Sequence, residues 1–412
     1  METDNTKSTA KGFSFLKLAL FLLMLILVSG VVLYAFLDIN PLDALSEGIT
    51  GLYNRIFTVG ASEIDALKET VKPVLTFEQN ENVYCSAVSN NLVAASESYV
   101  KIIDPEGMEK AYIPVSLNKP FVMSSADDIL VADLSGHYFA LIVNNRIAWE
   151  KNIDEFIVNA SISDAWILLI TQSNQSGYKR TIRAYSKDGQ EVSFRSVSNY
   201  YPFVVFNYPE YNKASFAVSS LEASGLEANG IFEILDPEMN QKTSIKGENE
   251  IFGGCYPLLE ERLLIYGEKS LMTIDKGYHT IWEKNFEGYS VTAANVINNR
   301  FPVVALLNNE EYSRNRHFLT TVQIYNGNGT ERTSFDIDAK VTGIVSKKKT
   351  AAVIAESEVI FINEDGEIMD RFTARSNVSG VYLAKDDLAY VVSADTVSRV
   401  NIKVKQKFLG LF

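Results

Sequence analysis

A block of two β-rich runs separated by a turn recurs eight times along most of this chain. Residues that favour turns mark the first seven copies, at a mean spacing of about 43 residues, which is the length of one four-stranded blade of a β-propeller. The copies begin at Val100, Phe139, Ile182, Ile231, Leu271, Val322, Val359 and, in a degenerate form, Val397. The turn markers are Gly107, Asn145, Gly189, Asn240, Gly277, Gly327 and Gly366.

Two further apolar runs precede each block, for example residues 83–88 and 92–96 before the first copy. Each unit therefore has four strands, which we call a, b, c and d in chain order. Such a unit cannot bury both of its faces alone, whereas stacking units around an axis covers the faces and leaves only short edges. The pattern predicts an all-β fold over residues 73–412, an eight-bladed β-propeller, with seven blades as the alternative. Val74 to Phe77 precede the first complete unit and are expected to pair with the last blade and close the ring.

A second feature precedes the repeats, a run of twenty uncharged residues at positions 18–37. At 1.5 Å per residue a helix of this length spans the ~30 Å hydrocarbon core of a bilayer, so the run predicts a transmembrane helix. The alternative is a cleaved signal peptide, because Val28-Ser29-Gly30 resembles a cleavage site, but seven more apolar residues follow it.

Charges on the two sides of residues 18–37 predict the orientation of the chain. Lys7, Lys11 and Lys17 precede the run, whereas Asp38 and Asp43 follow it. The positive-inside rule then predicts a cytoplasmic tail at 1–17 and an extracytoplasmic remainder, in a single-pass protein of the cell membrane. Residues 38–72 are expected to form a partly helical stalk that docks on its own domain; an amphipathic segment on the membrane or on a partner is the alternative.

Composition removes several classes of function. Lys and Arg number 38 against 51 Asp and Glu, and the resulting net charge of -13 opposes binding to nucleic acid. The chain has two cysteines and three histidines, too few for a structural zinc cluster, a haem attachment motif or a disulfide-rich scaffold.

Two matching segments carry a resemblance to a known family. Residues 148–152 and 281–285 contain the sequence Trp-Glu-Lys-Asn and resemble the Trp-bearing outer strand of quinoprotein-like (PQQ-type) propellers. The whole chain resembles a family of single-pass, membrane-anchored propeller proteins of this type from Gram-positive anaerobic bacteria. Quinoprotein dehydrogenases use adjacent cysteines at the cofactor; because Cys85 and Cys255 are far apart in sequence, the resemblance implies no cofactor here.

Other reactive side chains are assigned structural roles. Cys85 and Cys255 fall in strand a of the first and fifth units, opposite each other in an eight-bladed ring, so both are expected to be free, buried thiols. The histidines fall in different units without a second ligand at metal-binding spacing, which predicts no metal site. Residues 133–137 contain Asp, Ser and His, but neighbours within one turn cannot form a catalytic relay, so they are expected to form a turn.

Three b–c connections are longer than the others, at 172–180, 219–230 and 308–317, and are expected on one face because strands alternate in direction. Two of them combine aromatic and basic side chains suited to an acidic or glycan partner. The candidate partner-binding residues are Tyr178, Lys179, Arg180, Tyr312, Arg314, Arg316 and His317.

Loops displayed on a rigid scaffold usually carry recognition. The sequence therefore favours an extracytoplasmic, membrane-tethered scaffold that binds an envelope protein or a wall polymer, without catalysis. Two alternatives stay open: a ligand sensor that signals through a membrane partner, and an enzyme with its site at the central channel.

Overall fold

The structure, a computed structural model, describes residues 71–78, 80–207, 215–223 and 228–403. The predicted tail, transmembrane segment and all but the end of the stalk lie outside these residues. Among the helices of the described part, none has the length and apolar character needed to cross a bilayer.

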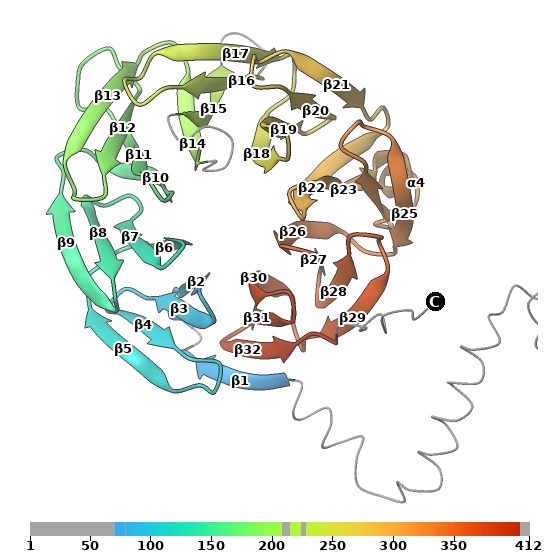
Figure 1. Cartoon of the computed structure of the whole chain (residues 1–412), viewed down its shortest axis with the longest axis horizontal. Helices are drawn as coiled ribbons and strands as arrows, with labels where there is room; N and C mark the ends of the chain where they lie inside the picture. The colour runs from blue at the N-terminus through green and yellow to red at the C-terminus, as the bar shows by residue number, and fades with distance from the viewer. Residues whose placement is uncertain (1–70, 79, 208–214, 224–227, 404–412) are drawn as a thin grey trace, which may run out of the picture. The chain divides into compact units, whose positions relative to one another are not determined.

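Eight four-stranded antiparallel sheets follow one another around a central axis, which confirms the eight-bladed β-propeller (Figure 1). Strand a of every blade is innermost and strand d outermost. The first blade contains β2 (Tyr84–Val88), β3 (Asn91–Ala95), β4 (Tyr99–Ile103) and β5 (Glu109–Pro114). The second contains β6 (Pro120–Ser125), β7 (Asp128–Asp133), β8 (Tyr138–Val143) and β9 (Arg146–Asn152). The third contains β10 (Ile157–Ile162), β11 (Trp166–Gln172), β12 (Arg180–Ser186) and β13 (Glu191–Val197). The fourth contains β14 (Tyr201–Asn207), β15 (Phe216–Ala223), β16 (Ala228–Leu235) and β17 (Gln241–Gly247).

The second half of the ring repeats the arrangement, with one helical insertion. The fifth blade contains β18 (Phe252–Leu258), β19 (Arg262–Gly267), β20 (Ser270–Ile274) and β21 (Thr280–Asn285). The sixth contains β22 (Tyr289–Ile297), β23 (Phe301–Asn308), helix α4 (Asn309–Asn315), β24 (Thr320–Tyr325) and β25 (Glu331–Ile337). The seventh contains β26 (Val341–Lys347), β27 (Thr350–Ala355), β28 (Glu358–Asn363) and β29 (Ile368–Thr373). The eighth contains β30 (Val378–Lys385), β31 (Leu388–Ser393), β32 (Thr396–Asn401) and, from the other end of the domain, β1 (Val71–Thr76).

The ring closes through β1, which supplies strand d of the eighth blade. It pairs antiparallel with β32, from Val71 opposite Val400 to Thr76 opposite Thr396. The expected closure by the segment at Val74 is thus confirmed, and the strand begins two residues before the expected start of the propeller. The last repeat contributes only its first run to the described fold.

The core consists of eight hydrophobic clusters, each between two neighbouring blades. Strands b and c are covered on both faces and are apolar without alternation, as in β27 (TAAVIA), where every residue is buried. Strands d lie at the perimeter and alternate exposed with half-buried residues, as in β25. Continuous apolar runs and alternating runs therefore distinguish inner from outer strands.

Outer-strand tryptophans connect successive blades. Trp149 on β9 donates its indole N–H to the carbonyl of Lys187 in the third blade, at 2.8 Å. Trp282 on β21 donates to the carbonyl of Gly327 in the sixth blade, at 3.0 Å. The two Trp segments that carry the sequence resemblance therefore anchor one blade to the c–d turn of the next.

The c–d turns lie where the sequence predicts them. In three of the seven turns, however, the residue with positive φ is not the predicted turn marker. Met239, Tyr278 and Gly329 adopt positive φ, instead of Asn240, Gly277 and Gly327. In two of these turns an aspartate stabilises the backbone in place of glycine: the carboxylates of Asp236 and Asp275 accept backbone N–H groups four residues later, at 2.8 and 2.9 Å. A non-glycine residue can then hold the left-handed conformation.

Candidate functional site

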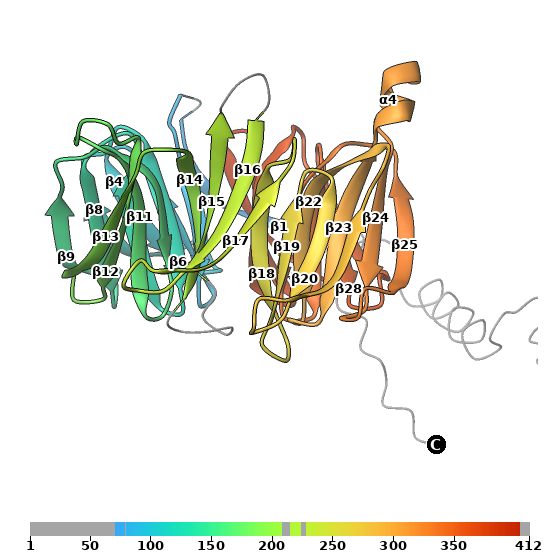
Figure 2. The ribbon, with the colours of Figure 1, turned by 90° about the horizontal axis from the view of Figure 1, so that it is seen from above.

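The b–c turns and the links between blades lie on one face of the ring, which we call the link face. In most blades, backbone hydrogen bonds join the b–c turn to the link that leaves the same blade. Examples are Leu117 N to Glu97 O at 2.9 Å, Phe286 N to Lys269 O at 2.8 Å and Ala374 N to Ser357 O at 2.8 Å. Helix α4 stands on this face (Figure 2). Long b–c insertions are consequently displayed together on one side of a rigid scaffold.

The third-blade insertion, residues 173–179, presents two of the predicted side chains. Tyr178 is 40% exposed. The Lys179 ammonium lies 4.2 Å from the ring centroid of Tyr201 and donates to the carbonyl of Asn199 at 3.2 Å. Tyr201, itself 39% exposed, begins β14 and is not among the residues that the sequence predicted, because it lies in a different blade from the insertion. Tyr178, Lys179 and Tyr201 form what we call the third-blade patch.

Arg180 departs from the prediction. It is the first residue of β12, paired with Gln172 and Val197 on the flanking strands, and is half-buried. Its Nε atom is buried and has no hydrogen-bond partner among the described residues. Because it belongs to the sheet, Arg180 is less available to a partner than a residue at a loop tip.

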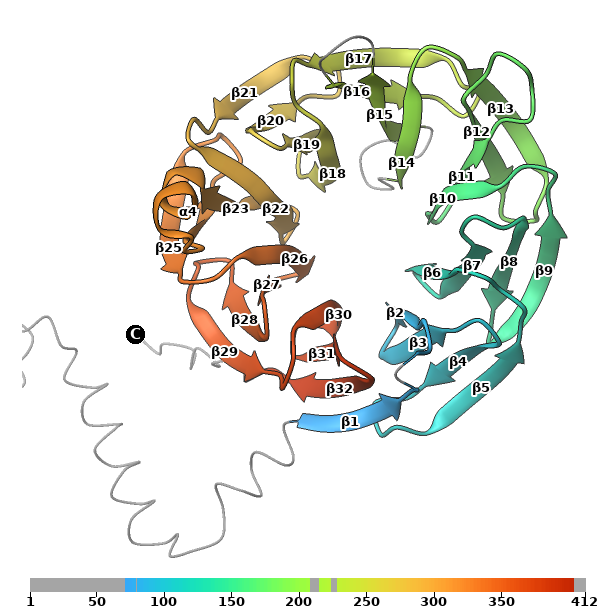
Figure 3. The same cartoon turned by 180° about the vertical axis from the view of Figure 1, so that it is seen from behind.

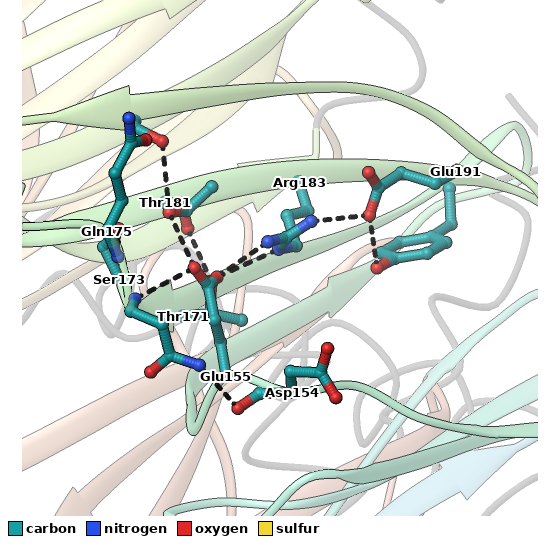
Figure 4. A network of polar contacts seen from close by, with 11 residues as sticks. Asp154, Glu155, Thr171, Ser173, Gln175, Thr181, Arg183 and Glu191 are labelled. Atoms are coloured by element: carbon teal, nitrogen blue, oxygen red, sulfur yellow. Dashed lines mark hydrogen bonds and ion pairs between the residues drawn. The ribbon is translucent and has the colours of Figure 1, made fainter.

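A buried carboxylate fixes the base of the third-blade insertion (Figure 4). Glu155, in the link before β10, accepts hydrogen bonds from the Thr171 hydroxyl at 2.5 Å and the Asn174 backbone at 3.2 Å. The Arg183 guanidinium on β12 donates to Glu155 Oε2 through Nε at 3.1 Å and Nη2 at 2.9 Å, and to Glu191 through Nη1 at 2.7 Å. Residues from the link, from two strands and from the insertion thus meet at one side chain.

Opposing effects set the pKa of the Glu155 carboxyl. Burial acts to raise this pKa, but the hydrogen bonds from Thr171 and Arg183 outweigh burial and hold it below the ordinary value. Glu155 is therefore an ionised anchor for the loop. No local sequence pattern points to this anchor, because Glu155 and Arg183 are 28 residues apart.

The sixth-blade insertion is a short helix whose start is encoded locally. The Asn308 side chain caps it by accepting the Glu311 N–H at 3.0 Å, which is the Asn-x-x-Glu pattern of a helix N-terminus. At the base, Asn308 N donates to Leu319 O at 2.9 Å and Asn309 N donates to Gly288 O at 3.0 Å. None of the residues of α4 is buried. An ordered element that contributes nothing to the core is thus held on the link face.

Four predicted residues gather on or just after α4, and we call them the sixth-blade patch: Tyr312, Arg314, Arg316 and His317. Tyr312 stacks on Phe318, with centroids 4.7 Å apart, and the Arg316 guanidinium lies 5.5 Å from the Tyr312 centroid. Arg314 pairs with Glu310 one turn away, with 72% of its side chain exposed. His317 Nδ1 lies 3.9 Å from Glu311 Oε1. Exposed pairs of this kind are weak, so the arginines can exchange partners.

The fourth-blade insertion was predicted too long. Ser219 and Gly230 lie within β15 and β16, which extend to Ala223 and from Ala228. Pairing of the two strands continues past Ser219, since Leu221 lies opposite Gly230 and Ala223 lies opposite Ala228. Only residues 224–227 remain between the strands, outside the described structure.

The structure keeps the two patches separate. They belong to the third and sixth blades, three positions apart around the ring (Figure 3). No contact recorded between described residues joins them. Both insertions lie on one face, as the sequence predicts, and the link face therefore offers two separate surfaces to a partner.

The remaining predicted side chains take structural roles. Cys85 on β2 and Cys255 on β18 are free, buried and in opposite blades, as predicted. Burial raises the pKa of the Cys85 thiol to about 12 and raises that of Cys255 as well. Across the described ranges, no three His, Cys, Asp or Glu side chains come together to hold a metal ion.

Residues 134–137 form the predicted turn, between β7 and β8. The Asp133 carboxylate accepts the N–H groups of Asn118 and Lys119 at 2.9 and 2.8 Å. His137 instead lies against Phe156, with centroids 4.4 Å apart. Asp133 and His137 are therefore directed to different neighbours.

Comparison with protein families identifies the chain. One family profile, described as a family of unknown function (DUF5711), matches residues 67–402. The chain belongs to the DUF5711 family. No curated protein matches this DUF5711 chain.

Solved structures share its fold at low identity. Sqt1 of Saccharomyces cerevisiae has a TM-score of 0.59 and 9% identity, and the match covers 80% of the DUF5711 chain and 98% of Sqt1. BamB of Moraxella catarrhalis has a TM-score of 0.54 and 14% identity, with 82% and 98% covered. The WD40 domain of SCAP from fission yeast has a TM-score of 0.50 and 9% identity, with 81% and 98% covered. These similarities concern the propeller fold.

Proposed function

We propose that this DUF5711 protein is a membrane-anchored, extracytoplasmic interaction scaffold that uses its link face to bind an envelope protein or a wall polymer. The observation that carries the proposal is α4. The helix is ordered and has no buried residue, yet it is fixed to the ring at both ends, so its role lies in what it displays. What it displays is an aromatic ring and two arginines, which are common anchors of interfaces.

The anchoring is proposed from the sequence. Residues 18–37 would span the membrane, the tail 1–17 would lie in the cytoplasm, and residues 38–72 would connect the span to the propeller. Protease added to intact cells should then digest the propeller or release it, and should leave the N-terminal tail intact. A protected propeller in intact cells with an active protease would contradict the orientation.

The binding surface is tested by partner capture. The double variant Arg314→Ala, Arg316→Ala should reduce crosslinking to envelope components in intact cells, because a contact arginine contributes about 2 kcal/mol, roughly thirtyfold in affinity. Its thermal stability should change by about 0.5 kcal/mol or less, since both side chains are exposed.

A matched control removes two positive charges from the opposite face. Arg146→Ala, Lys276→Ala changes residues at c–d turns, where both side chains are exposed. Capture should persist in this control. If the wild type and both double variants capture the partner equally, the sixth-blade patch is not the binding surface.

A further inference from the structure

A groove of about 480 Å³ opens on the link face beside α4, where the sixth, seventh and eighth blades meet. Its walls come from the end of the α4 insertion (Phe318), the link before β26 (Lys340), the b–c turn of the seventh blade (Glu356) and the link before β30 (Asn377). None of these residues is near another in sequence, so the packing of three consecutive blades assembles them. The volume suits a small ligand or a few units of a polymer.

Hydrogen bonds fix the position of two walls. Thr320, which follows Phe318 closely, donates its hydroxyl to the carbonyl of Ala339 at 2.7 Å and so holds the insertion beside Lys340. Val378 N donates to the carbonyl of Glu356 at 2.7 Å and joins the link before β30 to the b–c turn of the seventh blade. The groove is preformed, and a ligand would lose little free energy in ordering it.

Bulges direct two hydroxyl side chains to the same groove. The register of β26 shifts between Val341 and Gly343, and that of β30 shifts between Val378 and Gly380. The extra residues are Thr342 and Ser379, both exposed and both lining the groove. The same bulge occurs near the start of strand a in the third to eighth blades, and in the seventh and eighth it places Thr342 and Ser379 at the groove.

The polar side chains that line the groove carry one positive and one negative charge, and they include both hydrogen-bond donors and acceptors. Lys340 supplies an ammonium donor and Glu356 a carboxylate acceptor, while Asn377 supplies both a donor and an acceptor. No ion pair between described residues engages Lys340 or Glu356. One positive and one negative charge favour neither an acidic nor a basic ligand, which points to a neutral ligand rich in hydroxyl and amide groups.

Apolar side chains line the groove beside these polar groups. Phe318 lines the groove with Ile354 and Val378, and Tyr312 stacks on the Phe318 ring at 4.7 Å and holds it in place. A sugar ring carries apolar C–H faces next to hydroxyls, and an acetamido group carries an N–H, a C=O and a methyl group. This combination matches the donors, acceptors and apolar side chains that line the groove.

We infer that the groove binds a neutral chain of N-acetylated hexosamines. The inference rests on the proposed function, because it names the class of wall polymer that the scaffold would hold. The α4 insertion would then have a second role, since it supplies the aromatic wall of the glycan site through Phe318.

Titration of the full-length protein in detergent with chitotetraose, followed by calorimetry, tests the inference. The wild type should bind saturably, and Lys340→Ala, Asn377→Ala should weaken the affinity at least about tenfold, because two donors to the sugar are lost. The control Lys276→Ala, Gln190→Ala removes the same chemical groups from exposed c–d turns on the opposite face and should bind as the wild type does. Glu356→Gln keeps the size of the side chain and should also weaken binding.

Absence of saturable binding by the folded wild type would overturn the inference, as would equal affinity in the groove variant and the control. Preferential binding of an acidic peptide in place of the sugar would overturn it as well. Partner crosslinking could depend on Arg314 and Arg316 but not on Lys340 and Asn377. That result would support the scaffold function and contradict the glycan site.

Discussion

At the scale of single residues, the charged groups that matter most for structure are few and buried. Glu155 is 7% exposed and receives donors from three parts of the third blade. On the next blade, Glu233 is 1% exposed and accepts from Tyr200 at 2.6 Å and Arg195 at 3.2 Å. Buried carboxylates of this kind require their partners, because an unpaired buried charge is strongly destabilising. They position the link-face loops without being available to a ligand.

The Glu155→Gln variant tests this role. We expect a loss of about 2–4 kcal/mol in the free energy of unfolding, since Arg183 loses a buried anionic partner. Glu191→Gln, which changes the more exposed partner of the same arginine, should lose about 1 kcal/mol or less. Urea unfolding at neutral pH measures both, and equal losses would argue against Glu155 as the anchor.

The same residue gives a pH dependence of defined sign. Because the pKa of Glu155 is lowered in the folded protein, its stabilisation is present above the ordinary pKa of 4.5 and is lost as the pH falls through the lowered value. The stability difference between wild type and Glu155→Gln should therefore shrink below about pH 4.5. A difference that stays constant down to pH 3 would contradict the assignment.

The thiols provide a separate test at this scale. Burial disfavours the thiolate of Cys85, whose pKa is about 12, so both thiols should react slowly with a disulfide reagent at pH 8 in the folded protein. Denaturation in urea without reductant should expose two titratable thiols, and Cys85→Ala should expose one. Absence of reactive thiols in urea would show a disulfide and a wrong placement of the blades.

At the scale of elements, contacts between the outer strands and the next turn complete each blade. Gly189 has φ +84°, and a Cβ at this position would lie 3.0 Å from Cδ2 of Trp149. The glycine is therefore required twice, for its backbone conformation and for the close approach of the indole. Gly177, in the third-blade insertion, has φ +86° with nothing within 4 Å of a built Cβ.

This pair of glycines separates the two requirements. Gly177→Ala should lower the free energy of unfolding by about 1 kcal/mol through backbone strain alone. Gly189→Ala should lower it by about 2–3 kcal/mol, because the Trp149 ring must also move. Combining Gly189→Ala with Trp149→Ala should give less than the sum of the single effects, and strict additivity would show that the contact does not matter.

At the scale of the whole molecule, stability depends on closure of the ring. Each of the eight clusters joins two blades, so every blade has two neighbours only if the first and eighth meet. Strand β1 stabilises this junction by pairing with β32 of the eighth blade. The Arg399 guanidinium adds a hydrogen bond across it, from Nη1 to the carbonyl of Pro105 at 3.0 Å.

Two truncations test the closure. A chain that begins at residue 71 keeps β1, and a chain that begins at residue 78 lacks it, while neither contains the proposed membrane span. The shorter chain should melt at least about 10 °C lower, since β32 loses its partner and part of the last cluster is exposed. Circular dichroism measures both transitions, and equal midpoints would contradict closure by β1.

The fold could be predicted from the amino-acid sequence because the signals of a propeller are local and repeated. Apolar runs separated the inner strands from the outer ones, and turn residues such as Gly107 and Gly366 marked the blades at a regular period. The segment at Val74 precedes the first complete four-stranded unit, and its pairing with the last blade to close the ring could therefore be predicted. The 308–317 segment, predicted as a b–c loop, contains the helix α4, and Asn308 and Glu311 carry a capping pattern that is visible in the sequence.

The side chains that the link face presents could not be predicted in this way, because they depend on contacts between distant parts of the chain. Glu155 meets Arg183 across 28 residues, Arg180 is held in a strand, and the third-blade and sixth-blade patches are kept apart by the geometry of the ring. The groove beside α4 joins Phe318, Lys340, Glu356 and Asn377 from four separate connections. Repeats specify how each blade folds, because those interactions lie within one period. Which loops become neighbours depends on the number of blades and on how the ring closes, and no single repeat contains that information.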